Sequence, residues 1–102
     1  RVEATDLRMA GHVETAVYRT AQEALQNVAK HAAAQSVRIR LSRHAERVLL
    51  EVSDDGAGFD PAQVNGGYGL RGMRARVAEA GGTLTVRSAP GAGTHVCAMV
   101  PA

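Results

Sequence analysis

Apolar side chains recur along this chain with two different periods, and the order in which the periods alternate limits the fold most. From Val13 to about Ala33 no residue breaks a helix. Apolar residues recur there three and four positions apart, as on a helix with one buried face: Val17, Ala21, Ala24, Leu25, Val28 and Ala32. Residues 36–42 and 47–53 instead alternate apolar and polar side chains, as strands with one buried face do. Joined through residues 43–46, these two stretches predict an antiparallel hairpin.

The same succession is repeated in the second half of the chain. A glycine-rich loop reaches to Tyr68, and a shorter helical pattern runs from about Leu70 to Ala80, where two glycines stop it. The alternating stretches 83–88 and 94–100 then predict a second hairpin, and the first residues of the chain also alternate as in a strand. The order helix, hairpin, loop, helix, hairpin predicts an α+β fold in which helices cover one face of a mostly antiparallel sheet.

Length and composition exclude several classes of protein. The 102 residues fit a single domain, which we expect to be excised from a longer protein. A net charge of +2, scattered arginines and only three aromatic residues argue against nucleic acid as a partner. No stretch approaches the ~20 apolar residues of a membrane span, so we expect any membrane anchor to lie outside this chain. The single cysteine, Cys97, suits a reduced intracellular compartment, and its apolar surroundings in the sequence predict a buried core thiol.

One side of the long predicted helix carries a polar group of residues beside its apolar stripe. Arg19, Glu23, Asn27, Lys30 and His31 fall within a sector of roughly 120° when residues are spaced at 100°. Such a set suits a magnesium and phosphate site, in which Asn27 gives an oxygen to the metal, Lys30 a positive charge and Glu23 an acceptor. An exposed helix face with polar pairs one turn apart explains the same pattern, and the helix alone leaves both interpretations open.

An acidic pair ends the second strand of the first hairpin. Asp54 and Asp55 are followed by Gly56 and Gly58 in "DDGAG". Glycines at a strand end are consistent with turn chemistry alone. They also let the backbone approach a flat ligand, and a carboxylate fixed at this place is a natural acceptor for the amino group of adenine.

A second glycine cluster, "GGYGLRGM", matches the dinucleotide fingerprint through Gly67, Gly69 and Gly72. The sequence on either side of the cluster argues against a dinucleotide-binding site. A polar, proline-bearing loop precedes the cluster where a buried strand is required, and no acidic residue follows Glu79. The cluster nevertheless opens a helix, whose first N–H groups favour phosphate oxygens.

Taken together, "YRTAQEALQNVAKHA", "DDGAGF", "GGYGLRGM" and "PGAGTHV" resemble the motifs of the GHKL superfamily of ATP-binding domains in both order and distance. They are most similar to the catalytic and ATP-binding domain of two-component sensor histidine kinases of the nitrate-sensor class. The resemblance covers residues 11–101. It implies a two-layer sandwich of the Bergerat type with a mixed, mostly antiparallel sheet, and it implies ATP and Mg²⁺ as cofactors.

The resemblance also implies a role for individual residues. Glu23 would orient the incoming phosphoacceptor, Asn27 would hold magnesium, and Lys30 and His31 would contact the phosphates. Asp54 would accept from the adenine amino group, assisted by Thr94 through water. The glycines and one neighbour would shape the base pocket and the phosphate-side loop: Gly56, Gly58, Gly67, Gly69, Leu70 and Gly72. The segment between Phe59 and Gly67 corresponds to a short ATP lid, and the role of Asp55 stays open.

The resemblance predicts an enzyme domain that donates the γ-phosphoryl group of ATP to a histidine on a separate dimerisation-phosphoacceptor domain. A response regulator downstream, a homodimeric full-length protein and a cytoplasmic location within a membrane-anchored bacterial sensor follow from the same resemblance. Two alternatives are a nucleotide-binding regulatory module without transfer activity and an anti-sigma-type serine kinase of the same superfamily. The presence of Glu23, Asn27 and Lys30 argues against a module without transfer activity. The sequences "KH" and "GLRGM" argue against a serine kinase, because they are similar to the histidine kinase class.

Overall fold

The computed structural model describes residues 2–4, 11–29, 36–58 and 70–102. Both predicted helices and both predicted hairpins are present. In chain order the elements are β1 (Val2–Ala4), α1 (Gly11–Asn27), β2 (Val37–His44), β3 (Arg47–Asp54), α2 (Leu70–Glu79), β4 (Thr83–Ser88) and β5 (Thr94–Pro101). α1 continues into a wider π turn at residues 28–29, and the predicted helical residues 30–33 lie outside the described part of the chain.

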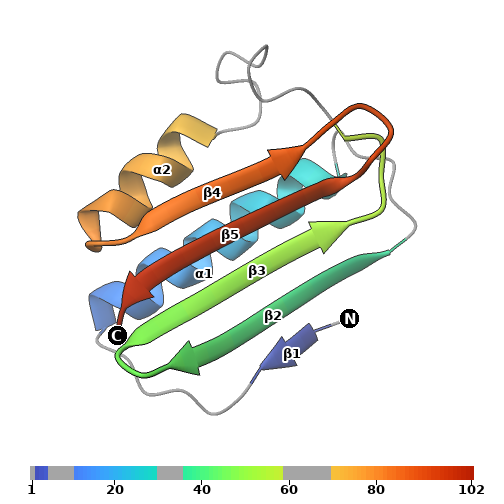
Figure 1. Ribbon diagram of the computed structural model, residues 1–102. Helices are drawn as coiled ribbons and strands as arrows, with labels where there is room; N and C mark the ends of the chain where they lie inside the picture. The colour runs from blue at the N-terminus through green and yellow to red at the C-terminus, as the bar shows by residue number, and fades with distance from the viewer. Residues whose placement is uncertain (1, 5–10, 30–35, 59–69) are drawn as a thin grey trace.

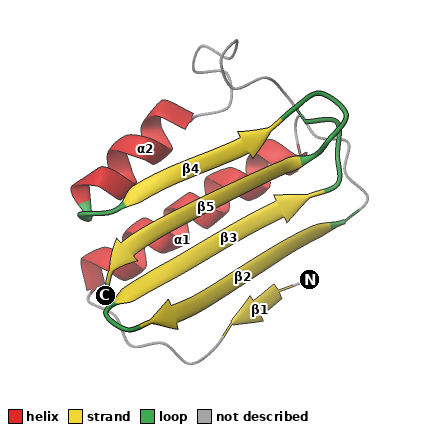
Figure 2. Ribbon diagram, in the orientation of Figure 1, coloured by secondary structure: helices red, strands yellow, loops and turns green. Residues whose placement is uncertain are grey.

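The strands form one five-stranded sheet in the order β1-β2-β3-β5-β4. β1 runs parallel to β2, whereas all the other neighbours are antiparallel, so the sheet is mixed. Both helices lie on the same face of the sheet (Figures 1 and 2). The predicted two-layer α+β fold is therefore confirmed. None of the helices in the described ranges is long and apolar enough to cross a membrane.

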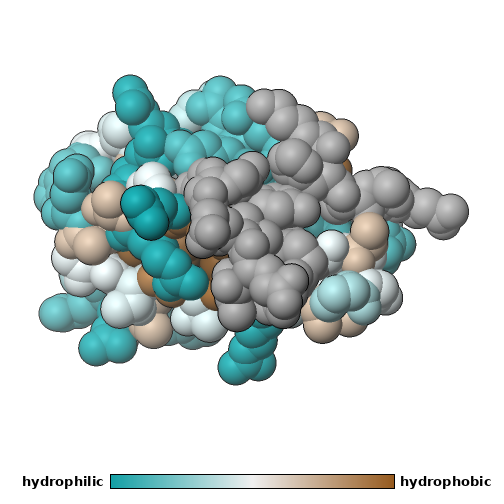
Figure 3. Space-filling model, turned by 90° about the horizontal axis from the view of Figure 1, so that it is seen from above, coloured by the Kyte–Doolittle hydropathy of each residue, from teal (hydrophilic) through white to brown (hydrophobic). Residues whose placement is uncertain are grey.

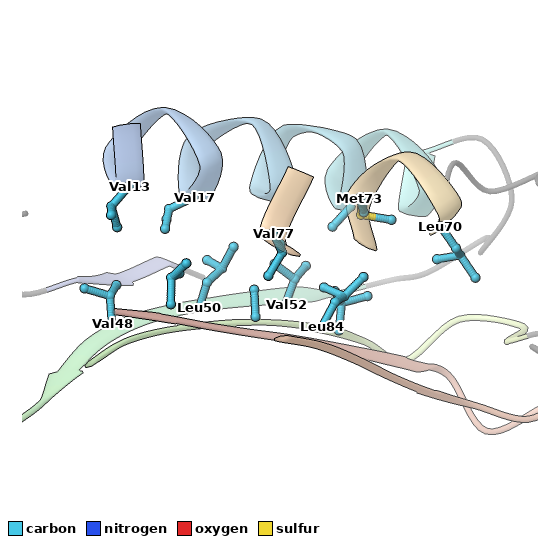
Figure 4. Packing of buried hydrophobic residues seen from close by; sticks show 13 residues of the cluster. Val13, Val17, Val48, Leu50, Val52, Leu70, Met73, Val77 and Leu84 are labelled. Atoms are coloured by element: carbon cyan, nitrogen blue, oxygen red, sulfur yellow. The ribbon is translucent and has the colours of Figure 1, made fainter. Parts of the chain in front are cut away.

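The core lies between the two layers (Figure 4). Val48, Leu50 and Val52 point from β3 toward the helices, because alternate residues of a strand share a face. The helices and the second hairpin contribute the other buried apolar side chains: Val13, Ala16, Val17, Ala24, Leu70, Met73, Val77, Leu84, Val96, Ala98 and Val100. Aliphatic residues of moderate size fill the interior, as the scarcity of aromatics requires.

The apolar stripe predicted for the first helix is shifted by part of a turn in the structure. Leu25, expected on the stripe, is 39% exposed, whereas Thr20 is fully buried. The Thr20 hydroxyl donates a hydrogen bond of 2.7 Å to the carbonyl of Ala16, which satisfies it inside the helix. The buried face follows the position of the sheet and of α2, which the sequence of the helix alone does not contain.

Glycines end the second helix as predicted. Gly81 has φ +83° and donates to the carbonyl of Ala78 at 2.9 Å, and Gly82 donates to Val77 at 2.9 Å. This pair of bonds is the Schellman motif, in which a left-handed residue closes the helix. The chain turns at once into β4.

Cys97 does not lie in the core, which contradicts the prediction from its apolar neighbours. Val96 and Ala98 are buried under the helices, so Cys97 between them faces the opposite, helix-free side of the sheet and is only half-buried. Partial burial and the neighbouring Glu51 carboxylate raise the pKa of the Cys97 thiol, while Arg87 acts in the opposite direction. The thiol is a surface group whose thiolate is disfavoured.

Candidate ATP site

Two loops meet at one end of the sheet, one after β3 and one between β4 and β5 (Figure 2). Gly91 donates its N–H to the carbonyl of Ala57, which joins the loops directly. A Cβ atom on Gly58 would lie 2.1 Å from the carbonyl oxygen of Ala89, and one on Gly93 would lie 2.2 Å from that of Asp54. Both glycines also have a positive φ, +67° and +75°. These two positions therefore require glycine, because the backbones approach too closely for any side chain.

Asp54 lies at the end of β3 where the loops meet. Its Oδ1 accepts a hydrogen bond of 2.8 Å from the N–H of Gly56, so the carboxylate shapes the glycine-rich turn that follows it. Asp54 is paired in register with Thr94 on β5. The two residues lie at the edge of an open hollow of about 500 Å³ that is also lined by Ser53, Arg87, Ser88, Ala89, Ala92, Gly93 and His95. Ser53 and His95 alternate with the buried Val52 and Val96, so this hollow extends onto the helix-free face of the sheet. The predicted pairing of Asp54 with Thr94 thus has a structural basis, although their contact with a nucleotide remains a prediction.

The second acidic residue, Asp55, has a different environment. Its Oδ1 accepts from the N–H of Ser36 and its Oδ2 from the Ser36 hydroxyl, each at 3.0 Å. Ser36 immediately precedes β2, so this pair of bonds ties the end of β3 to the entry of the neighbouring strand. The adjacent carboxylates therefore divide two tasks: Asp54 shapes the loop at the hollow, and Asp55 fastens the chain on the other side.

Ser88 supports Thr94 from the neighbouring strand. Its hydroxyl donates to the carbonyl of Gly93 at 2.8 Å and lies 3.0 Å from the Thr94 hydroxyl. Ser88 and Ser36 were not predicted from the sequence, because a single serine next to a strand end carries no spacing signal. Ser88 holds the Gly93–Thr94 segment in place, and Ser36 holds the Asp55 carboxylate.

On α1, Glu23 and Asn27 lie one turn apart as predicted, and both are half-buried. α1 runs toward the end of the sheet where the two loops meet (Figure 1). The Glu23 carboxylate forms an ion pair with Arg76 of α2, another residue that the sequence analysis did not single out. Within the described ranges, neither Glu23 nor Asn27 lines the hollow that Asp54 and Thr94 share.

The remaining predicted residues fall at the start of α2 or outside the described ranges. The side chain of Leu70 is buried in the core at 8% exposure, so only its main chain is available to a ligand. Gly72 is exposed, and a Cβ atom built on it would meet nothing within 4 Å. Lys30, His31, Gly67 and Gly69 lie outside the described residues.

Among the described residues, Asn27 is the one that the sequence analysis assigned to magnesium. The described residues contain no group of three or more histidine, cysteine, aspartate or glutamate side chains suited to a metal ion. Mg²⁺ usually keeps several waters and binds through one or two protein oxygens together with substrate phosphates. The single amide oxygen of Asn27 fits that mode.

The surface in Figure 3 is mainly hydrophilic in its described part, with small hydrophobic areas.

Comparison with known proteins places this geometry in a family. Residues 12–102 match the family of histidine kinase-, DNA gyrase B- and HSP90-like ATPases. The chain is 41% identical over 85 residues to the signal transduction histidine-protein kinase/phosphatase UhpB of Salmonella typhimurium, covering 83% of this chain and 17% of the relative. It is 36% identical over 103 residues to DegS of Bacillus subtilis, another signal transduction histidine-protein kinase/phosphatase, covering 97% of this chain and 27% of the relative. The chain thus spans about a quarter or less of the length of these relatives.

Solved structures agree with the sequence relatives. A blue-light activated histidine kinase of Erythrobacter litoralis EL346 superposes with a TM-score of 0.85 at 26% identity, covering 99% of this chain and 34% of that one. The histidine kinase AdeS of Acinetobacter baumannii superposes with a TM-score of 0.79 at 13% identity, covering 99% of this chain and 52% of that one, which shows a shared fold. The interlocked glycine loops, the helix-covered mixed sheet and these matches lead to one conclusion. This chain belongs to the histidine kinase-, DNA gyrase B- and HSP90-like ATPase family, and within it the chain is similar to the ATPase domains of sensor histidine kinases.

Proposed function

We propose that the chain is the catalytic, ATP-binding domain of a two-component sensor histidine kinase, and that it passes the γ-phosphoryl group of ATP to a histidine on a separate domain. The observation that carries this proposal is the junction of the Gly58 loop with the Gly93 turn, which sets Asp54 beside Thr94 at the ends of β3 and β5. Such a junction suits a flat base with one exocyclic amino group, because Asp54 is an acceptor held by a rigid backbone.

In this proposal the described residues bind ATP with Mg²⁺ and orient the phosphoacceptor. Asp54 accepts from the adenine amino group, with Thr94 next to it, and Gly56 and Gly58 shape the base pocket through the turn that follows Asp54. Asn27 supplies an amide oxygen to Mg²⁺, which neutralises phosphate charge when it is bound. Glu23 orients the acceptor imidazole. The phosphate side of the same site is formed by Lys30, His31, Gly67, Gly69, the main chain of Leu70 and Gly72.

The partners of this domain belong to the same proposal. A dimerisation-phosphoacceptor domain, a response regulator and a homodimeric full-length protein are the assemblies in which such a transfer is used. The compartment is the cytoplasmic side of a bacterial sensor. This fragment contacts neither nucleic acid nor membrane directly.

Transfer to an added acceptor tests the proposal. The purified chain is incubated with Mg²⁺ and ATP labelled at the γ-phosphate, with and without a dimerisation-phosphoacceptor fragment taken from a similar kinase. We expect ATP binding and no label on the chain alone over hours, since none of its four histidines stands in an acceptor motif. Acid-labile label on the added fragment supports the proposal. Label on serine, or ATP binding without any transfer, contradicts it.

A second measurement tests the metal assignment. Asn27→Ala removes the only amide oxygen that this proposal gives to Mg²⁺, so ATP affinity should no longer respond to Mg²⁺. Titration of ATP into wild type and variant, each with and without Mg²⁺, decides this. A variant that keeps the wild-type magnesium response shows that the metal is held elsewhere.

A further inference from the structure

An ion pair connects the two helices at a residue to which the proposed function gives a role. The Arg76 guanidinium contacts the carboxylate of Glu23 through Nη1 and Oε1. The two side chains are 27% and 29% exposed, so each is more than half withdrawn from water. The partners are 53 positions apart in sequence, and the contact therefore exists only because α1 and α2 pack side by side.

The neighbourhood of this pair is charged on both helices. Arg19 lies one turn before Glu23 on α1, and Glu79 lies one turn after Arg76 on α2. Arg19, Arg76 and Glu79 line a hollow of about 390 Å³ between the helices, with His12, Thr15, Ala16 and Ala80. Charges of alternating sign thus flank Glu23, and Arg76 is its contact from the second helix.

We propose that Arg76 is a positioning residue for phosphoryl transfer, which holds the Glu23 carboxylate in the one orientation that serves the acceptor. This inference rests on the proposed function. A glutamate on a helix surface has several rotamers, and fixing one of them costs conformational entropy at the moment of reaction. The contact of Arg76 Nη1 with Glu23 Oε1 restricts these rotamers before the acceptor arrives. The guanidinium is planar and always charged, so it holds a carboxylate more firmly than a flexible ammonium group does.

The transfer itself defines what Glu23 has to do. An imidazole nitrogen of the acceptor forms a bond to the γ-phosphorus while the bond from that phosphorus to the bridging oxygen breaks, and ADP leaves with the electron pair. The attacking imidazole must present its lone pair in line with the breaking bond, and its ring proton must face an acceptor. A carboxylate that Arg76 holds in place meets the second requirement. Arg76 touches none of the reacting atoms.

The test measures single-turnover transfer from ATP to the added acceptor fragment. Arg76→Met keeps an unbranched stem and removes the guanidinium. We expect the transfer rate to fall between ~10-fold and ~100-fold, since small misplacements of a catalytic group have effects of this size, while ATP affinity stays within about twofold. Arg76→Lys keeps the charge without the planar guanidinium, so part of the rate should return. This second variant also serves if Arg76→Met fails to fold.

A double-mutant comparison separates positioning from support of the helix. In a Glu23→Ala background the carboxylate is gone, and adding Arg76→Met should lower the rate no further. Arg74→Met is the matched control, since Arg74 Nη1 donates to the carbonyl of Leu84 at 2.9 Å and ties the same helix to β4. Its transfer rate should stay within about twofold of wild type. Equal losses from Arg76→Met in both backgrounds, or a wild-type rate in Arg76→Met, overturn the inference; failure of the wild-type chain to transfer at all overturns the proposed function itself.

Discussion

The two ends of the sheet connect their strands in opposite ways. At one end, β2 and β3 are joined by the two residues Ala45 and Glu46, and the N–H of Ala102 bonds to Glu46 at 2.7 Å. At the other end, the loops after β3 and before β5 lock together through Gly58, Gly91 and Gly93. The first end closes a hairpin with little chain. The second needs glycine, because the two loops approach each other too closely for side chains at Gly58 and Gly93.

The largest expected effect tests whether the glycine junction is needed. Gly93→Ala would place a Cβ atom 2.2 Å from the carbonyl oxygen of Asp54 at φ +75°. We expect the free energy of unfolding to fall by about 3 kcal/mol or more. The two backbone segments must move apart to make room for the Cβ atom, and alanine is also strained in the left-handed conformation at this position. Urea unfolding followed by circular dichroism measures this.

Gly91→Ala is the control within the same turn. Gly91 also has a positive φ, +79°, but a Cβ atom there would meet nothing within 4 Å. Its cost should be limited to the left-handed conformation, about 1 to 2 kcal/mol. Equal losses for the two variants would mean that close approach does not matter at this junction.

The next effect concerns ligand binding at the same end. Asp54→Asn keeps an oxygen that can accept from Gly56, so the turn should survive, while the charged acceptor for adenine is lost. A hydrogen bond to a charged group contributes about 1.5 to 3 kcal/mol, which corresponds to an ATP affinity roughly 10- to 100-fold weaker. Isothermal titration calorimetry tests this. An unchanged affinity would show that the base binds elsewhere.

A smaller effect separates the two adjacent acidic residues. Asp55→Ala removes the two hydrogen bonds from Ser36 at 3.0 Å. Because these bonds are exposed, we expect a loss of about 1 kcal/mol in the free energy of unfolding and an ATP affinity within about twofold of wild type. A large loss of affinity with intact stability would instead assign Asp55 to the ligand.

The smallest effect lies at the opposite end of the sheet. Ala45 has φ +56° in the two-residue turn, a conformation that glycine adopts without steric cost. Ala45→Gly should raise the free energy of unfolding by about 0.5 kcal/mol, since relief of strain exceeds the added chain entropy. Thermal unfolding measures the gain, and ATP affinity should not change. A loss of stability would show that the turn is not strained.

Particular residues show how far the sequence predicted the fold and the site. The alternation of Val48, Leu50 and Val52 predicted their common buried face, and Gly81 with Gly82 predicted where α2 ends. The predictions for Leu25 and Cys97 were wrong. Leu25 lies at the edge of a stripe whose centre depends on the packing of α1, and Cys97 lies in an apolar run whose alternate positions face the helix-free side.

The sequence by itself determined the order of helices and strands, the two-layer fold class and the family motifs, because periodicity and turn residues act over a few positions along the chain. Only the tertiary structure decided that Asp54 and Asp55 have different partners, that Gly58 and Gly93 lie against carbonyl oxygens, and that Arg76 contacts Glu23. Apart from the bond between Gly56 and Asp54, which spans two positions, each of these contacts joins segments far apart in sequence. Their distances are set by how strands and helices pack, and no local pattern encodes that packing.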